Sequence, residues 1–197
     1  MSIARPRSYH HGDLRAELLR RAEATLRRSG VDGLSLRQLA RDTGVSHAAP
    51  SRHFRDKQAL LDALAVAGFD RLGGAFEKAA ASGTFLERLH AMARTYLRFA
   101  IDNPALLALM FARKHRQTPD IEAAAARTLA TPFDMIADGQ ERGEVVDGDP
   151  RTICLSAMAA LQGLATFVGS GFVPPEEADV LFEETVRHML DGLRPRR

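Results

Sequence analysis

Residues 35–54 read SLRQLARDTGVSHAAPSRHF, a stretch that has the pattern of two short helices joined by a tight turn. Ser35 and Gln38 have the spacing of a capping box, in which each side chain satisfies an exposed backbone N–H of the other residue. Two helices that cross steeply need a small side chain at their contact, and Ala40 supplies it. Gly44 permits the positive φ that a tight turn requires. The stretch therefore predicts a helix-turn-helix.

The second helix of this unit is predicted to begin at Ser46, with its first residues turned toward solvent. When a helix-turn-helix meets DNA, the start of its second helix lies in the major groove. Histidine can donate to or accept from a base edge, and an alanine methyl group can contact a thymine methyl. Arginine, lysine and the backbone N–H groups at helix starts can bind phosphates. We therefore expect a DNA-binding surface made of Ser35, Arg37, Ser46, His47, Ala48, Ala49, Ser51, Arg52, His53 and Lys57.

The charge of the chain is concentrated at its N-terminal end. Residues 1–60 hold 12 Arg and Lys against 6 Asp and Glu, whereas residues 61–197 hold 15 against 19. The formal net charge of +2 therefore conceals a basic segment joined to a mildly acidic remainder. The same helix-turn-helix pattern occurs at corners of helical proteins that bind no DNA. In a basic segment it favours binding to a polyanion.

Helical spacing of apolar residues recurs along the rest of the chain, and no stretch sustains the alternation that is typical of a strand. Polar residues followed by proline open three of the expected helices, at Asn103, Thr118 and Asp149. We expect Pro132 to kink or split the helix that contains it. The fold class is therefore all-α with about nine helices: from Asp13 to Ser29, from Ser35 to Gly44, a very short one from Ser46, from Asp56 to Ala81, one opened by Thr84, and 104–112, 119–142, 150–168 and 175–191.

These helices are predicted to form two domains joined by a long helix. Residues 10–55 contain the helix-turn-helix, residues 56–82 form the linking helix, and residues 83–192 form a second helical domain. Three glycines in the linking helix, Gly68, Gly73 and Gly74, can soften it.

The chain is similar to the TetR/AcrR family of transcriptional regulators. The residues that carry the resemblance are HHGDLR at 10–15, LSLRQLARDTGVS at 34–46 and RHFRDKQALLDAL at 52–64. The resemblance implies an all-α homodimer whose N-terminal three-helix domain binds operator DNA. It also implies a C-terminal domain with an effector cavity and a dimer interface built from the last two long helices.

Two positions depart from the pattern of the relatives. Most members place a tyrosine that is expected to contact a backbone phosphate where this chain has Ser51. Serine reaches less far, so the contact here is expected to be weaker or water-mediated. YLRFAIDNPALLALMF at 96–111 resembles a subfamily with a Trp…His-Gly signature. The signature falls at Met158…Gln162-Gly163, so its tryptophan and histidine are absent.

The second domain is expected to hold an apolar cavity. Methionine and aromatic residues at helical spacing more often form core than a binding site, but an amide in an uncharged stretch needs a hydrogen-bond partner, which can be a ligand. No cluster of charged residues indicates a strongly charged ligand. We therefore expect an apolar or amphipathic small molecule, bound by Met92, Tyr96, Phe99, Met110, Phe111, Phe133, Met158 and Gln162.

No charged residue occurs from Thr152 to Pro175, a length that is also sufficient to cross a bilayer. The stretch contains several glycines and polar residues, so a membrane span is disfavoured and no membrane partner is expected. Gly163 and nearby alanines allow helices to approach closely. We therefore expect a homodimer that pairs helices 150–168 and 175–191 of two copies in a four-helix bundle.

Catalytic candidates are few, so an enzyme is not expected. The single cysteine, Cys154, excludes a disulfide framework and lies in an apolar helix where a reactive thiol is disfavoured. We expect no metal and no cofactor, and the N-terminal stretch, which lacks an apolar segment, indicates a cytoplasmic protein.

The sequence thus predicts a ligand-responsive DNA-binding regulator, in which a small molecule releases a repressor from a palindromic operator. Three alternatives stay open: a regulator without an effector, an activator, and a helical enzyme with a basic surface.

Overall fold

The computed structural model describes residues 11–112 and 118–194, and all regular secondary structure in this part of the chain is helical. Its eight α-helices are α1 (His11–Ser29), α2 (Leu36–Thr43), α3 (Lys57–Ala80), α4 (Phe85–Asp102), α5 (Pro104–Phe111), α6 (Pro119–Glu141), α7 (Pro150–Gly169) and α8 (Ala178–Leu193). Two 3-10 helices, Pro50–Arg52 and Pro175–Glu177, complete it. The all-α prediction is confirmed. The count of about nine helices differs because the expected third helix is not α-helical.

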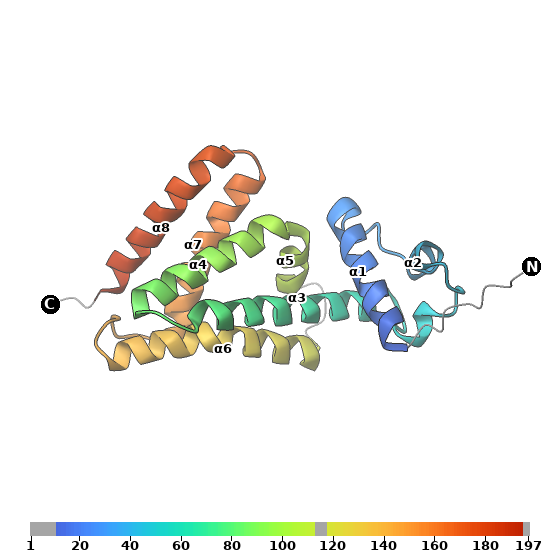
Figure 1. Ribbon diagram of the computed structural model, residues 1–197, viewed down its shortest axis with the longest axis horizontal. Helices are drawn as coiled ribbons and strands as arrows, with labels where there is room; N and C mark the ends of the chain where they lie inside the picture. Colours follow the sequence, from blue (N-terminus) through green and yellow to red (C-terminus); the bar gives the residue numbers. More distant parts are fainter. Residues whose placement is uncertain (1–10, 113–117, 195–197) are drawn as a thin grey trace, which may run out of the picture.

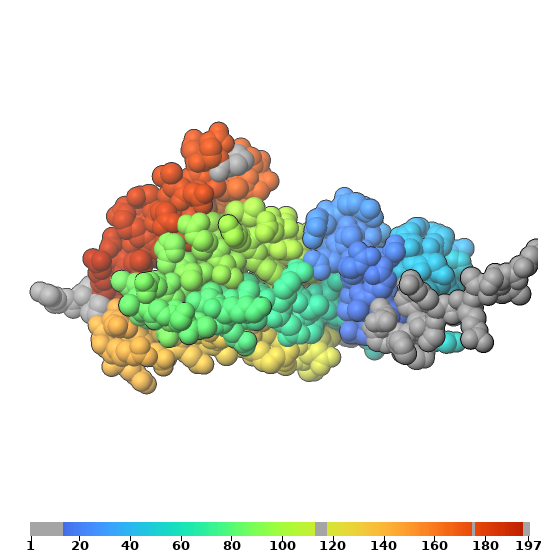
Figure 2. All heavy atoms as spheres, viewed as in Figure 1, coloured from blue at the N-terminus to red at the C-terminus, as the bar shows by residue number. Residues whose placement is uncertain are grey.

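The molecule is elongated, with α1 and α2 at one end and α8 ending at the other (Figure 1). We call α1, α2 and the segment 44–56 the head, and the helices from α3 onward the body. The long helix α3 runs from the head into the body, where α4, α5 and α6 pack on it. The turn that joins α7 to α8 projects from the body on the side away from α6, as the ribbon and the space-filling view agree, whereas α7 itself also packs on α6 (Figure 2).

One continuous apolar core joins the head to the body. It extends from Leu18 in α1 through Phe69 and Leu72 in α3 to Phe182 in α8, and all four side chains are almost completely buried. Because α3 contributes to the core along its whole length, the head and the body share one set of packed side chains.

Two of the three glycines named in α3 have a packing role. A Cβ added at Gly68 would lie 2.7 Å from Met110 Sδ on α5, and one at Gly73 would lie 3.2 Å from Thr128 Oγ1 on α6. The absence of a side chain at these positions therefore lets α5 and α6 approach α3 closely. Gly74 has open space around it.

The helix that was expected from Ser46 is a turn followed by the 3-10 helix Pro50–Arg52. Pro50 has no N–H, so the carbonyl of Ser46 cannot accept the hydrogen bond from residue 50 that an α-helix requires. Instead it accepts from the N–H of Ala49 at 2.9 Å, and the N–H of His53 bonds the carbonyl of Pro50 at 3.0 Å. These i→i+3 bonds define a tighter helix than the sequence predicted.

The proline-containing helix starts are confirmed, but only one of their three caps is. Asp149 accepts from the N–H groups of Arg151 and Thr152. Asn103 makes no side-chain cap and its amide donates to the carbonyl of Phe99 instead, and Thr118 makes none. Of the kink or split expected at Pro132, the split does not occur, because α6 continues through Pro132 while it packs against α3.

Candidate nucleic-acid interface and cavities

The turn of the helix-turn-helix has the geometry that its residues predict. Gly44 has φ 69°, in the left-handed region, and the N–H of Val45 donates to the carbonyl of Ala40 at 3.0 Å. Ala40 is completely buried at the helix contact. Only half of the expected capping box forms: Ser35 Oγ accepts from the N–H of Gln38 at 3.5 Å, but the Gln38 amide donates to Asp42.

The segment after the turn is anchored by two buried residues and leaves its polar residues outside. Pro50 and Phe54 are buried, and the guanidinium of Arg15 lies 5.5 Å from the centre of the Phe54 ring. His47, which precedes Pro50, and Arg52, which lies between Pro50 and Phe54, are exposed. The anchors therefore fix the backbone while the groups suited to base and phosphate contact stay at the surface.

None of the ten residues expected to contact DNA is buried. Seven are exposed, namely Ser35, Arg37, Ser46, His47, Ala48, Ser51 and Arg52, and three are half-buried, namely Ala49, His53 and Lys57. They lie on α2 and its N-cap, on the turn 46–49, on the 3-10 helix and its C-cap, and at the start of α3.

The cations of this surface are available to an external anion. Arg37, Arg52 and Lys57 form no ion pair with any carboxylate in the described ranges. Asp56, the neighbouring acidic residue, accepts from the N–H of Ala59 at 2.7 Å and so caps α3. Phosphate is the natural partner of such unpaired cations on a helix-turn-helix.

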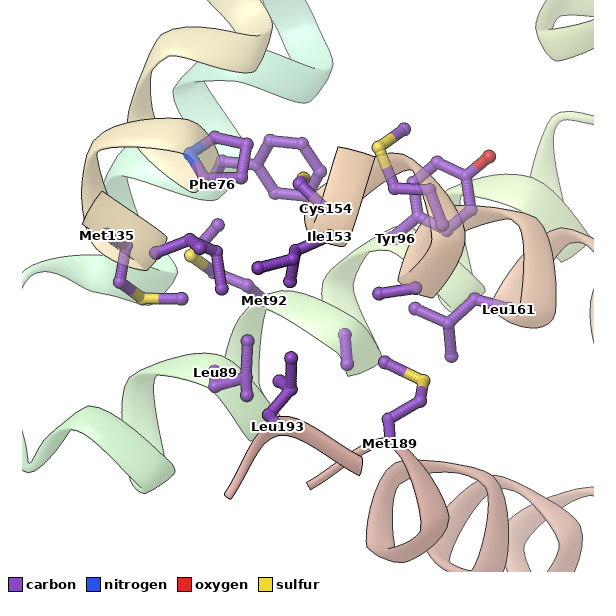
Figure 3. A pocket seen from close by; sticks show the side chains of 15 residues that line it. Phe76, Leu89, Met92, Tyr96, Met135, Ile153, Cys154, Leu161, Met189 and Leu193 are labelled. Atoms are coloured by element: carbon purple, nitrogen blue, oxygen red, sulfur yellow. The ribbon is translucent and has the colours of Figure 1, made fainter. Parts of the chain in front are cut away.

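A small apolar cavity lies inside the body, between α3, α4, α6, α7 and α8 (Figure 3). Its volume is about 50 Å³, and we call it the inner cavity. Burial raises the pKa of the Cys154 thiol in its wall to about 11 and that of the Tyr96 phenol to about 12. The lining residues are Phe76, Leu89, Met92, Ala93, Tyr96, Pro132, Met135, Ile136, Ile153, Cys154, Ala157, Met158, Leu161, Met189 and Leu193.

A wider groove of about 650 Å³ lies between α4, α5 and α7, and we call it the outer groove. The hydroxyl of Tyr96 donates to Gln162 Oε1 at 3.1 Å across it. The groove is lined by uncharged residues: Tyr96, Ala100, Pro104, Leu107, Ala108, Phe111, Leu155, Met158, Ala159, Gln162, Ala165, Thr166, Gly169 and Ser170.

Five of the eight residues expected to bind a ligand line one of these two spaces: Met92, Tyr96, Phe111, Met158 and Gln162. Three do not. Met110 lines a separate hollow between α3, α5 and α6, and Phe133 is half-buried against the core. Phe99 is buried with its ring 5.3 Å from the Arg71 guanidinium, so it is turned away from both spaces.

Sequence reasoning missed the lining residues of α6 and α8, among them Met135, Ile136 and Met189. Their helical spacing is the spacing of ordinary core residues, so periodicity alone could not separate a cavity wall from a filled core.

The α7–α8 hairpin carries an apolar surface. Phe167 and Phe172 are 51% and 77% exposed, and their ring centroids lie 5.2 Å apart. Gly163 has nothing within 4 Å of the position that a Cβ would take. In the described ranges, α7 alone is long and apolar enough to cross a membrane, and 28% of that window is buried. Helices of this composition also occur in the cores of soluble proteins.

A helix-turn-helix head with unpaired surface cations, joined by a long helix to a body with internal space, defines a helical DNA-binding regulator. Residues 18–64 match the bacterial regulatory proteins of the tetR family, and residues 89–189 match the tetracyclin repressor-like C-terminal domain. The chain therefore belongs to the TetR family of transcriptional regulators.

The relatives agree with this assignment. An HTH-type transcriptional regulator of Mycobacterium tuberculosis is 30% identical over 123 residues, which are 59% of this chain and 53% of that protein. The tetracycline repressor protein class A of transposon 1721 from Escherichia coli is 52% identical over 50 residues, 25% of this chain and 23% of that protein. This chain thus matches about half the length of the mycobacterial relative and less of the other.

Solved structures share the whole fold. A protein of unknown function from Rhodococcus sp. RHA1 is 42% identical and superposes with a TM-score of 0.87, over 95% of this chain and 99% of that one. A putative tetR family transcription regulator from Shewanella sp. PV-4, 17% identical, has a TM-score of 0.71 over 93% of this chain and 99% of that one. The second similarity concerns the fold alone.

Proposed function

We propose that this protein is a cytoplasmic repressor that binds a palindromic operator as a homodimer and is released by a mostly apolar small molecule. The observation that carries the proposal is the surface after Gly44, where buried Pro50 and Phe54 hold a backbone whose neighbouring His47 and Arg52 face solvent. Membership of the TetR family supports it independently.

The dimer is proposed to form through α7 and α8. Their exposed apolar residues need a cover in water, and a second copy of the same hairpin offers a self-complementary one across a two-fold axis. Two heads that read successive major grooves should then lie about 34–36 Å apart.

Release of the operator follows from thermodynamic linkage between the DNA-binding surface of the head and the ligand site in the body. A ligand that binds best when the heads are held at another spacing weakens operator binding, and DNA weakens ligand binding by the same factor. The core that runs from α1 through α3 into the body gives a physical path for this coupling. The outer groove and the inner cavity are the proposed ligand site.

An electrophoretic shift with the DNA that flanks the protein's own gene, at several defined salt concentrations, tests the proposal. Arg52→Gln should weaken binding to all sequences and reduce the salt slope by about 1, because one phosphate contact is lost. Arg142→Gln is the matched control, since Arg142 lies at the end of α6 away from the head, 3.4 Å from Asp138. A wild-type protein that shifts no flanking DNA at low salt would refute DNA binding.

A further inference from the structure

The inner cavity and the outer groove are separated by a wall of two side chains. Tyr96 and Met158 line both spaces, Tyr96 from α4 and Met158 from α7. In Figure 3 the Tyr96 hydroxyl points away from the other lining side chains, and its partner Gln162 belongs to the groove. The hydrogen bond from Tyr96 to Gln162 therefore holds the wall from the groove side.

The groove offers a ligand one side-chain donor. Thr166 donates its hydroxyl proton to the carbonyl of Gln162, and Ser170 donates its own to the carbonyl of Phe167. Gln162 Oε1 accepts from Tyr96, whereas its Nε2 donates to no group in the described part of the chain. An amide N–H in an otherwise apolar groove binds a hydrogen-bond acceptor such as a carbonyl oxygen.

The inner cavity is small as it stands but its wall is adaptable. Four methionines, Met92, Met135, Met158 and Met189, contribute to it. Unbranched methionine side chains change rotamer at low cost, so such a wall can enlarge for a guest. No charged residue lines the cavity, and its polar atoms are the thiol of Cys154 and the outward-facing hydroxyl of Tyr96. A flexible, unbranched apolar chain fits these properties.

We propose that the ligand is a neutral amphiphile that passes between Tyr96 and Met158. Its acceptor group stays in the outer groove on Gln162 Nε2, and its unbranched chain extends past the displaced wall into the inner cavity. This inference rests on the proposed ligand site of the regulator and specifies its entrance and the class of molecule it takes.

The test uses full-length protein and the 2-alkanones from 2-heptanone to 2-tridecanone, measured by calorimetry. In the wild type, affinity should rise by up to about fourfold for each added methylene, because each is buried in the cavity. Ala157→Leu fills the inner cavity from α7 and should flatten this rise for long chains while short ketones keep their affinity. Ala93→Val fills it from α4 and serves as a second variant if the first unfolds.

Gln162→Leu should weaken every ketone by about fivefold at any chain length, because one hydrogen bond to the head group is lost. Ala126→Leu adds the same atoms as Ala157→Leu to the exposed side of α6 and should leave the series unchanged. Unfolding midpoints of all variants verify that the fold is retained.

A chain-length series that Ala157→Leu leaves unchanged overturns the inference. So does the absence of ketone binding to the wild type, the result expected if a second copy of the chain fills the groove. Operator binding in the electrophoretic assay does not depend on either result, so failure here is distinguishable from failure of the proposed DNA-binding function.

Discussion

Arg71 on α3 donates hydrogen bonds to the carboxylate of Glu23 on α1, with Nη1–Oε1 and Nη2–Oε1 distances of 3.0 and 3.1 Å. The same guanidinium donates to Asn103 Oδ1, 3.2 Å away, at the junction of α4 and α5. One side chain of the long helix thus contacts the first helix of the head and the part of the body next to the outer groove. A shift at the α4–α5 junction can reach the head through this contact.

Arg71→Ala should reduce the factor by which a bound ligand lowers operator affinity, with little change in the ligand's own Kd. The side chains of Arg71 and Glu23 are 46% and 23% exposed, so a double-mutant cycle with Glu23→Gln should give a coupling of only about 0.5–1 kcal/mol, smaller at high salt. The control is Arg127→Ala, which breaks an exposed 2.9 Å ion pair with Asp70 that joins α6 to α3. If bound ligand lowers operator affinity by the same factor in Arg71→Ala and Arg127→Ala, Arg71 does not couple the ligand site to the head.

Gly44→Ala should destabilise the protein by about 1–2 kcal/mol, because an L side chain is disfavoured at φ 69°. Nothing lies within 4 Å of the added Cβ, so the cost is conformational rather than a clash. Gly74→Ala is the matched control: it lies inside α3 with open space around it and should stabilise by up to about 1 kcal/mol. Urea unfolding measures both. A Gly44→Ala variant as stable as the wild type would contradict the left-handed turn.

Features that depend on neighbouring residues could be predicted from the sequence. The Asp149 cap and the Gly44 turn involve residues within a few positions of each other, and both form. The helix expected from Ser46 failed for an equally local reason, since Pro50 removes the hydrogen bond that would continue an α-helix. A proline at position 50 is therefore sufficient to replace the expected α-helix by a turn and a 3-10 helix.

The cavity could be predicted only in part because it depends on which way side chains turn in the folded body. Tyr96 and Phe99 lie three residues apart on α4, yet Tyr96 lines both spaces and Phe99 packs against Arg71 of α3. Periodicity places both on the apolar side of a helix and cannot say which neighbour each will meet. Gln162 was identifiable because an amide in an uncharged stretch needs a hydrogen-bond partner, whichever way its side chain turns.

Phe167→Lys should convert the proposed dimer to monomer at micromolar concentration. A charge placed among exposed apolar residues on a two-fold interface faces its own copy, and loss of a central aromatic contact raises a dissociation constant by about 30-fold or more. Ala126→Lys puts the same charge on the exposed surface of α6, a helix that is not part of the proposed interface, and should leave the dimer intact. Analytical ultracentrifugation distinguishes the species. A Phe167→Lys protein that stays dimeric would place the interface elsewhere.

The stability of the protein should fall between about pH 9 and pH 11 through Cys154. Burial raises the pKa of this thiol from 9.0 to about 11, so in this range the unfolded chain loses a proton that the folded chain keeps. The contribution of this thiol to the free energy of unfolding is fully present below pH 9 and is lost as the pH approaches 11. By linkage, the free energy of unfolding falls by about 2–3 kcal/mol over this range.

Cys154→Ala should remove that part of the pH dependence, although it lowers stability at neutral pH by deleting a buried side chain. Tyr96→Phe provides the comparison, because the phenol with its pKa of about 12 accounts for the decline above pH 10 and not for the decline between pH 9 and 10. Chemical unfolding at half-unit pH steps separates the two. If Cys154→Ala keeps the wild-type slope between pH 9 and 10, another group titrates there and the thiol is not shielded from water as its burial implies.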